Sequence, residues 1–142
     1  MEQKTVDLVQ TSFKKVAPIA STAGEIFYTK LFELDPALKN IFPADDAEAM
    51  KGQGNKLMTM ISSAVAGLSN LDKLVPILQD LGKKHVGYKV EPSHYETVGS
   101  ALIGTLEAGL GDDFTADVKE AWIETYGVMA SVMKTAAYGE TA

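Results

Sequence analysis

The stretch LVPILQDLGKKH, residues 74–85, gives the clearest structural signal in the sequence. Its leucines at positions 74, 78 and 81 recur at steps of four and three residues, which places their side chains on one face of an α-helix. His85 follows four residues after Leu81 and continues that apolar face, whereas Lys83 and Lys84 point elsewhere. The stretch therefore predicts an amphipathic helix with a histidine on its apolar face.

Helical spacing of apolar residues extends through most of the remaining chain. Four or more residues never alternate cleanly between apolar and polar side chains, as they would in a half-buried strand. We therefore predict an all-α protein of about six to eight helices that forms one domain over residues 1–142. The further stretches with helical spacing are 19–34, 57–68, 98–110 and 118–133.

Short local signals predict where some of these helices begin and end. Asp35-Pro36 should end the first stretch, because the residue before a proline disfavours the helical conformation. Ser93, with Glu96 three residues later, has the pattern of a capping box and predicts a helix start. Thr115 is expected to cap the last helix.

The composition argues against several classes of function. The 142 residues include 13 lysines and arginines against 19 aspartates and glutamates, a formal net charge of −6. Every one of these cations is lysine, and an acidic chain without arginine is poorly suited to bind nucleic acid. The absence of cysteine excludes disulfides, thiolate metal sites and iron–sulfur clusters. No apolar run reaches the roughly 20 residues of a membrane span, and Glu2 and Asp7 do not fit a signal peptide, so we expect a cytoplasmic protein.

Common catalytic patterns do not fit the sequence. His85 and His94 lie on either side of Pro92, so they do not form a zinc pair on one helix. Gly52-Gln53-Gly54 resembles part of a dinucleotide fingerprint, but no strand precedes it and Leu57 stands where the third glycine would be. We therefore assign no catalytic residue on this basis.

The histidine on the apolar face has two interpretations. His85 either hydrogen-bonds to a carbonyl group inside the core, or serves as the single axial ligand of a planar metal cofactor held in an apolar slot. The second interpretation suits a small helical protein that has one inward histidine and no thiolate. The spacing alone leaves both open.

Further positions resemble the globin family, in particular the single-domain bacterial haemoglobins of the Vitreoscilla type and the globin domain of flavohaemoglobins. The similarity covers about residues 5–135. Pro36 followed by Phe42 resembles the globin corner, where a phenylalanine packs on the haem. The remaining matching positions are Leu81-Gly82-Lys83-Lys84-His85, His94-Tyr95, Val98-Gly99, Trp122 and Tyr126-Gly127.

This resemblance implies a haem b cofactor between two helices. His85 would be the proximal ligand of the iron through Nε2, and Tyr28, Gln53 and Leu57 would lie on the distal side. Because Gln53 replaces the distal histidine of many globins, we expect the distal iron position to be free or water-bound. The other residues that the resemblance places at the haem are Phe42, Lys56, Leu81, Val90, Tyr95 and Val98.

Each of these roles has a simpler alternative. Tyr28 would otherwise be an ordinary core aromatic residue, Gln53 an exposed helix residue and Lys56 a solvated surface lysine. Lys56 is of interest because a chain without arginine has only lysine to pair with the haem propionates. Near the proximal histidine, Tyr95 matches a tyrosine that joins a glutamate in flavohaemoglobins, but Ala137 occupies the glutamate position. Strong electron donation to the iron is therefore not expected, unless the helix continues and Glu140, three residues further on, takes the place of that glutamate.

The resemblance implies a protein that reversibly binds O2, for storage, transport or sensing, and that also takes CO and NO. Tyr28 and Gln53 would be the hydrogen-bond donors to the gas. The alternative is a nitric oxide dioxygenase, which would need a separate reductase because 142 residues leave no room for flavin and nicotinamide domains. A helical module that binds a protein partner is the third possibility. Whether the protein is an enzyme, and its oligomeric state, stay open.

Overall fold

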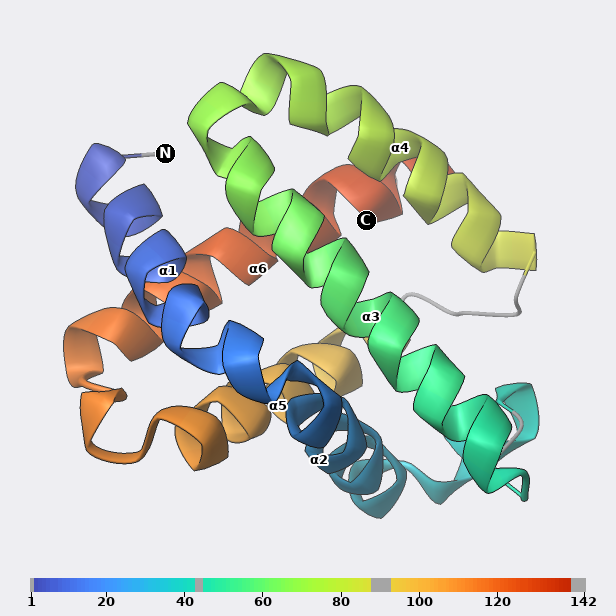
Figure 1. Ribbon diagram of the computed structural model, residues 1–142. Helices are drawn as coiled ribbons and strands as arrows, with labels where there is room; N and C mark the ends of the chain where they lie inside the picture. The colour runs from blue at the N-terminus through green and yellow to red at the C-terminus, as the bar shows by residue number, and fades with distance from the viewer. Residues whose placement is uncertain (1, 43–44, 88–92, 139–142) are drawn as a thin grey trace.

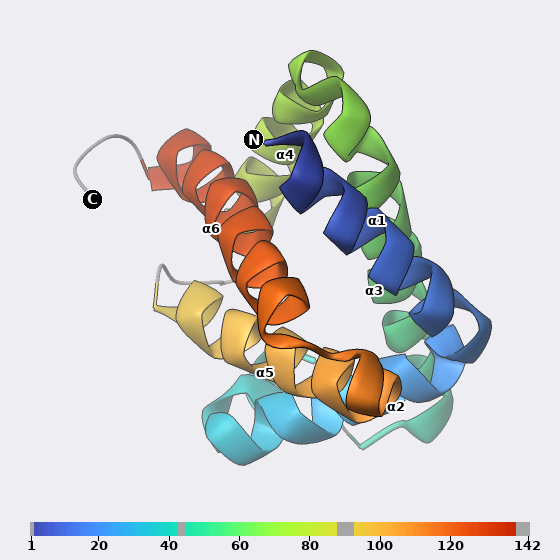
Figure 2. The same cartoon turned by 90° about the vertical axis from the view of Figure 1, so that its left-hand side faces the viewer.

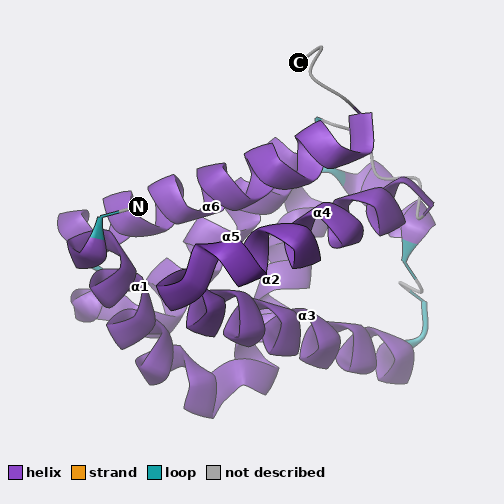
Figure 3. Cartoon of the chain, turned by 90° about the horizontal axis from the view of Figure 1, so that it is seen from above, coloured by secondary structure: helices purple, strands orange, loops and turns teal. Residues whose placement is uncertain are grey.

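The computed structural model describes residues 2–42, 45–87 and 93–138, with the side chains of residues 85–87 excepted. These ranges contain six α-helices and four short 3-10 helices and no strand, so the all-α prediction is confirmed (Figures 1 and 3). None of the described helices combines the length and the apolar character needed to cross a membrane. The α-helices are α1 (Gln3–Val16), α2 (Ala20–Leu34), α3 (Ala47–Gly67), α4 (Leu71–Gly87), α5 (His94–Leu110) and α6 (Ala116–Tyr138), and the 3-10 helices are η1 (Ala17–Ile19), η2 (Pro36–Ile41), η3 (Leu68–Asn70) and η4 (Gly111–Asp113).

Side-chain caps mark several of these helix starts. The Asp46 carboxylate accepts a hydrogen bond from the backbone N–H of Ala49 at the start of α3, over 3.1 Å. Thr115 Oγ1 accepts one from the Val118 N–H over 3.3 Å, which confirms the predicted cap of the last helix. The capping box predicted at Ser93 is wrong, although α5 does begin at His94. Ser93 already has a helical backbone conformation, so its side chain makes no capping hydrogen bond.

The helices pack in crossing pairs. Helix α2 lies against both α3 and α5, and α6 lies against α1 and α4. Helices α3 and α4 are joined by η3 and diverge from that connection (Figure 1). Away from η3, α3 packs mainly on α2 and α4 packs mainly on α6.

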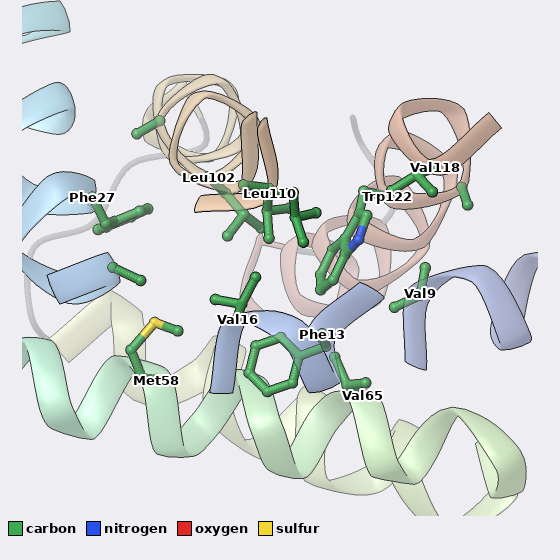
Figure 4. Close-up of a cluster of buried hydrophobic side chains, with 14 of the residues drawn as sticks. Val9, Phe13, Val16, Phe27, Met58, Val65, Leu102, Leu110, Val118 and Trp122 are labelled. Atoms are coloured by element: carbon green, nitrogen blue, oxygen red, sulfur yellow. The ribbon is translucent and has the colours of Figure 1, made fainter. Parts of the chain in front are cut away.

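The main core lies where α1, α2, α5 and α6 meet (Figure 4). Trp122 on α6 is fully buried, and its indole N–H donates to Ser12 Oγ on α1 over 2.8 Å. Ser12 in turn donates to the Leu8 carbonyl oxygen over 2.7 Å. A buried indole N–H needs such a partner, so this hydrogen bond sets how α1 lies on α6. The other large side chains at full burial are Leu31, Leu106, Val9 and Val16.

Candidate functional site

A polar contact between helices joins Tyr28 of α2 to Gln53 of α3. Tyr28 is buried and Gln53 is half-buried, and their side chains are hydrogen-bonded. The two helices can come this close because Gly24 and Gly54 meet at the crossing. A Cβ placed on Gly24 would lie 3.1 Å from the Cα of Gly54.

Two effects act on the acidity of the Tyr28 hydroxyl. Burial raises the pKa of Tyr28, and the hydrogen bond with Gln53 opposes that rise. A contact that lowers the pKa of a phenol favours the phenolate, to which the Gln53 amide N–H can donate.

Phenylalanines surround the ring of Tyr28. The ring centroid of Phe27 lies 5.1 Å away and that of Phe42 lies 5.2 Å away, both in edge-to-face geometry. Phe32 completes the cluster at 5.9 Å from both Tyr28 and Phe42. Phe42 stands directly after η2 and is half-buried, and its ring contact with Tyr28 is a tertiary contact that the sequence did not predict.

Helix α3 has two adjacent apolar faces that differ in burial. Met58 and Val65 are buried and face the core (Figure 4), whereas Leu57 and Ile61 are half-buried. Leu57 is four residues after Gln53, so the incompletely covered face is also the face of the Tyr28–Gln53 contact. Lys56 is exposed, as expected of a lysine at a cofactor edge or of any surface lysine.

Helix α4 buries the face that its leucine spacing predicts. Leu74 and Leu78 are each 4% exposed, Leu81 is half-buried, and Lys83 and Lys84 are exposed. His85 continues α4 at the register of that buried face, but its side chain lies outside the described residues. All of Val90 lies outside them as well.

Gly82 determines how closely α4 approaches α6, a role that sequence reasoning missed. A Cβ on Gly82 would lie 2.8 Å from the Cα of Met133 and would overlap the Met133 carbonyl oxygen. Sequence reasoning also missed that Gly24 and Gly54 set the approach of α2 to α3. It considers Gly54 only in the Gly52-Gln53-Gly54 pattern, which does not fit a dinucleotide site. A buried glycine inside an otherwise strong helix is the sequence signal for such contacts.

Tyr95, in the first turn of α5, has a buried hydroxyl without a hydrogen-bond partner in the described part of the chain. The side chain is 6% exposed, and burial, with a smaller contribution from nearby Tyr138, raises the pKa of Tyr95 to about 12. Val98, one turn later, is half-buried. Ala137 is half-buried on α6 and has no side-chain group that could bond the Tyr95 hydroxyl, while Glu140 lies outside the described residues.

These observations fit a flat, mainly apolar cofactor such as haem. Half-buried apolar side chains such as Phe42 and Leu57 are what a packed apolar cofactor would cover. The described residues hold no group of three or more histidine, aspartate or glutamate side chains suited to a metal ion. Haem iron needs only one protein ligand, so it does not require such a group.

Comparisons with known proteins agree with this assessment. The family model described as Globin matches residues 25–133. The chain is 29% identical to the flavohemoprotein of Bacillus subtilis (strain 168) over 130 residues and 32% identical to that of Xylella fastidiosa (strain Temecula1) over 133 residues, each alignment covering 92% of this chain and 32% of the relative. It is 29% identical to neuroglobin-1 of Oncorhynchus mykiss over 143 residues, covering 94% of this chain and 90% of that protein. The chain thus spans about a third of the length of the flavohemoproteins.

Proposed function

The chain belongs to the globin family, and from this premise we propose that it binds haem b and uses it to hold O2 reversibly. His85 is the proposed proximal ligand, with Tyr28, Gln53 and Leu57 on the distal side. Haem supplies the iron at which a diatomic gas such as O2, CO or NO binds. We also propose that residues 1–142 form a single domain and that the protein works in the cytoplasm.

The observation that supports O2 binding is the hydrogen bond between Gln53 and Tyr28. In this proposal, Gln53 fixes the orientation of the phenol, and Tyr28 keeps its hydroxyl proton available to the pocket. The surrounding phenylalanines exclude water that would compete for this proton. A hydrogen bond to an acceptor with negative charge is worth about 1.5–3 kcal/mol, which corresponds to a roughly 10- to 100-fold slower release of O2.

The remaining predicted residues have supporting roles in this proposal. Phe42, Val98 and Leu81 are half-buried apolar side chains that haem would cover. The exposed ammonium group of Lys56 is the candidate partner of a propionate. Tyr95 brings a buried hydroxyl to the proximal side, where its proton needs an acceptor.

The second candidate function is nitric oxide dioxygenation with a separate reductase. Tyr28 and Gln53 suit that reaction too, since it begins from the same O2-bound pocket. Ala137 disfavours it, because the methyl group that stands in place of the glutamate cannot accept a hydrogen bond from the Tyr95 hydroxyl and so cannot help to make the proximal histidine more electron-donating. We therefore place reversible O2 binding first.

Absorption spectroscopy tests the proposal directly. Titration of the haem-free protein with haemin should give one haem per chain, and the reduced form should show a five-coordinate spectrum that shifts with CO and with O2. His85→Ala should abolish this spectrum, whereas His94→Ala, the matched control, should preserve it. Failure to bind haemin, or a reduced spectrum with two protein ligands on the iron, would contradict the proposal.

A second measurement separates carrier from enzyme. The O2-bound protein is mixed with excess NO in the presence of a flavin-dependent reductase and its nicotinamide, and nitrate is measured with time. A single burst equal to the amount of protein supports the carrier. Sustained nitrate production would support the dioxygenase instead.

A further inference from the structure

Helices α3 and α4 are two arms that diverge from a common junction at η3. The junction is three residues long, and beyond it the two arms pack on different helices, α3 on α2 and α4 on α6 (Figure 1). Gln53 on α3 and His85 on α4 each lie about four helical turns, or about 20 Å, from η3. A small change of angle at η3 therefore moves these two residues apart by a much larger distance.

The junction changes the hydrogen bonding of the backbone at the end of α3. Where the α-helix gives way to the tighter η3, the carbonyl groups of its last turn lose their regular α-helical donors. The Val65 carbonyl oxygen accepts the Leu68 N–H instead. A carbonyl oxygen has two lone pairs, so Val65 can accept a second hydrogen bond from a side chain.

Gln10 of α1 makes that second hydrogen bond and extends it across the junction. Its side-chain amide nitrogen donates to the Val65 carbonyl oxygen over 2.9 Å and to Ser69 Oγ over 3.0 Å. Val65 belongs to the last turn of α3 and Ser69 belongs to η3, so one amide group bridges both sides of the junction. Gln10 is half-buried and its neighbour Val9 is fully buried, so the core holds this part of α1 in place.

Contacts of α1 and α6 relate the Gln10 bridge to the far arm, α4. Helix α1 lies against both α6 and α3 (Figure 2). The hydrogen bond from Trp122 to Ser12 joins α6 to α1, and the backbone of α6 at Met133 closely approaches α4 at Gly82. Gln10 thus completes a closed circuit of contacts that runs from η3 through α1, α6 and α4 back to η3. In such a circuit the angle between α3 and α4 cannot change without breaking a contact.

From these contacts we propose that Gln10 is a positioning residue for haem, which holds α3 and α4 at the angle that fits the cofactor and so slows its loss. This proposal rests on the proposed function, in which haem lies between Gln53 of α3 and His85 of α4. None of the residues proposed to contact haem lies on α1. Gln10 therefore acts through the junction and not by touching the cofactor.

The rate of haem loss from the haem-loaded full chain to an excess of a haem acceptor protein tests this proposal. Gln10→Met keeps the side-chain length and the helix propensity but has no N–H, so it should speed haem loss about 5-fold or more, the effect of one ordinary hydrogen bond. Gln79→Met is the matched control, because Gln79 is exposed on α4, and it should lose haem at the wild-type rate. Gln10→Lys restores N–H donors at a similar reach and should return the rate toward that of the wild type.

Hydrogen exchange of the purified full chain separates positioning from general stability. Gln10→Met should speed amide exchange in residues 66–74, around η3, by about 5-fold, because the bridge that restrains this segment is lost. Amides of α5 should keep their wild-type rates. Equal acceleration in all helices would overturn the proposal, because a general loss of stability would then account for the faster haem loss.

Two further results would overturn the positioning role. In the first, Gln10→Met loses haem at the wild-type rate; in the second, Gln10→Lys loses haem as fast as Gln10→Met. The wild type still binds haem in both cases, so the proposed function stands while this proposal fails. A wild-type chain that takes up no haemin would instead overturn the proposed function, and this proposal with it.

Discussion

At Tyr28, one side chain combines an aromatic ring held among phenylalanines with a hydroxyl group held by Gln53. The ring contacts fix where the phenol lies, and the Gln53 side chain is its polar partner. Under the proposed function, Tyr28 would be the residue that most directly sets the affinity for O2.

Tyr28→Phe should therefore speed O2 release about 10-fold or more, since the variant keeps the ring and loses only the donated hydrogen bond. CO release should change much less, because CO is a weaker hydrogen-bond acceptor, and this difference is the internal control. Stopped-flow displacement of O2 by CO measures the first rate, and displacement of CO by NO measures the second. An unchanged O2 rate would mean that the hydroxyl does not reach the ligand.

Tyr95 predicts an alkaline loss of stability. Folding raises the pKa of this phenol from its ordinary 10.0 to about 12, so above pH 10.0 the unfolded chain releases a proton that the folded chain retains. The stabilising contribution is complete below pH 10.0 and is lost as the pH rises through about 12. Urea unfolding across this range should show a shallower decline for Tyr95→Phe than for the wild type. A residual decline is expected, because burial also raises the pKa of Tyr28 and Tyr126.

At the scale of helices, glycines set the distances that position the site. Gly24 and Gly54 let α2 and α3 touch, which brings Tyr28 to Gln53. Gly82, three residues before His85, lets α4 contact the backbone of α6 at Met133. The position of the proposed proximal ligand thus depends on a residue that itself has no side chain.

Gly82→Ala should consequently destabilise the protein by about 1–3 kcal/mol, because the new methyl group meets backbone atoms that cannot rotate away. It should also weaken haem binding by shifting α4. Gly52→Ala is the matched control on α3, where a Cβ meets nothing within 4 Å. That change should stabilise the protein by about 0.5–1 kcal/mol through helix propensity. Urea unfolding and haemin titration measure both effects, and equal stability of the two variants would exclude a close α4–α6 contact.

At the scale of the whole molecule, α1 is joined to α6 by a hydrogen bond between residues that are far apart in sequence. Trp122 and Ser12 are both buried, and the indole N–H has Ser12 Oγ as its partner. Gln10 adds a second connection, since its amide donates to the Val65 carbonyl oxygen of α3 over 2.9 Å. Helix α1 therefore links the α3 and α6 parts of the assembly around the core.

Ser12→Ala should cost about 1–3 kcal/mol of unfolding free energy, because it leaves the Trp122 N–H buried without a partner. Ser62→Ala, an exposed serine of α3, should change stability by less than about 0.5 kcal/mol. Urea unfolding followed by tryptophan fluorescence reports on this contact directly, since Trp122 is the single tryptophan. Identical midpoints for the two variants would show that water replaces the serine hydroxyl.

The sequence alone determined the helices, because helical periodicity and caps depend on residues that are close together in the chain. Spacing of leucines along the chain predicted which face of α4 is buried, and Leu74 and Leu78 confirm it. The all-α class and the Thr115 cap are likewise confirmed, since each depends on residue types at short separations. The globin resemblance, which depends on positions spread along the chain, is confirmed by the family model. The predicted Ser93 capping box is wrong because Ser93 itself has a helical backbone conformation, although the helix begins at His94. The residue pattern alone does not distinguish this arrangement from a capped one.

Contacts between helices were decided only in three dimensions. Helical spacing indicates that a residue faces inward, but it does not say which other helix it meets or how near the two backbones come. The distance between helix backbones decides several features of the site. They are the hydrogen bond between Gln53 and Tyr28, the glycine contacts at Gly54 and Gly82, and the unpartnered hydroxyl of Tyr95. Packing is a property of pairs of surfaces, so it appears only once distant segments have been brought together.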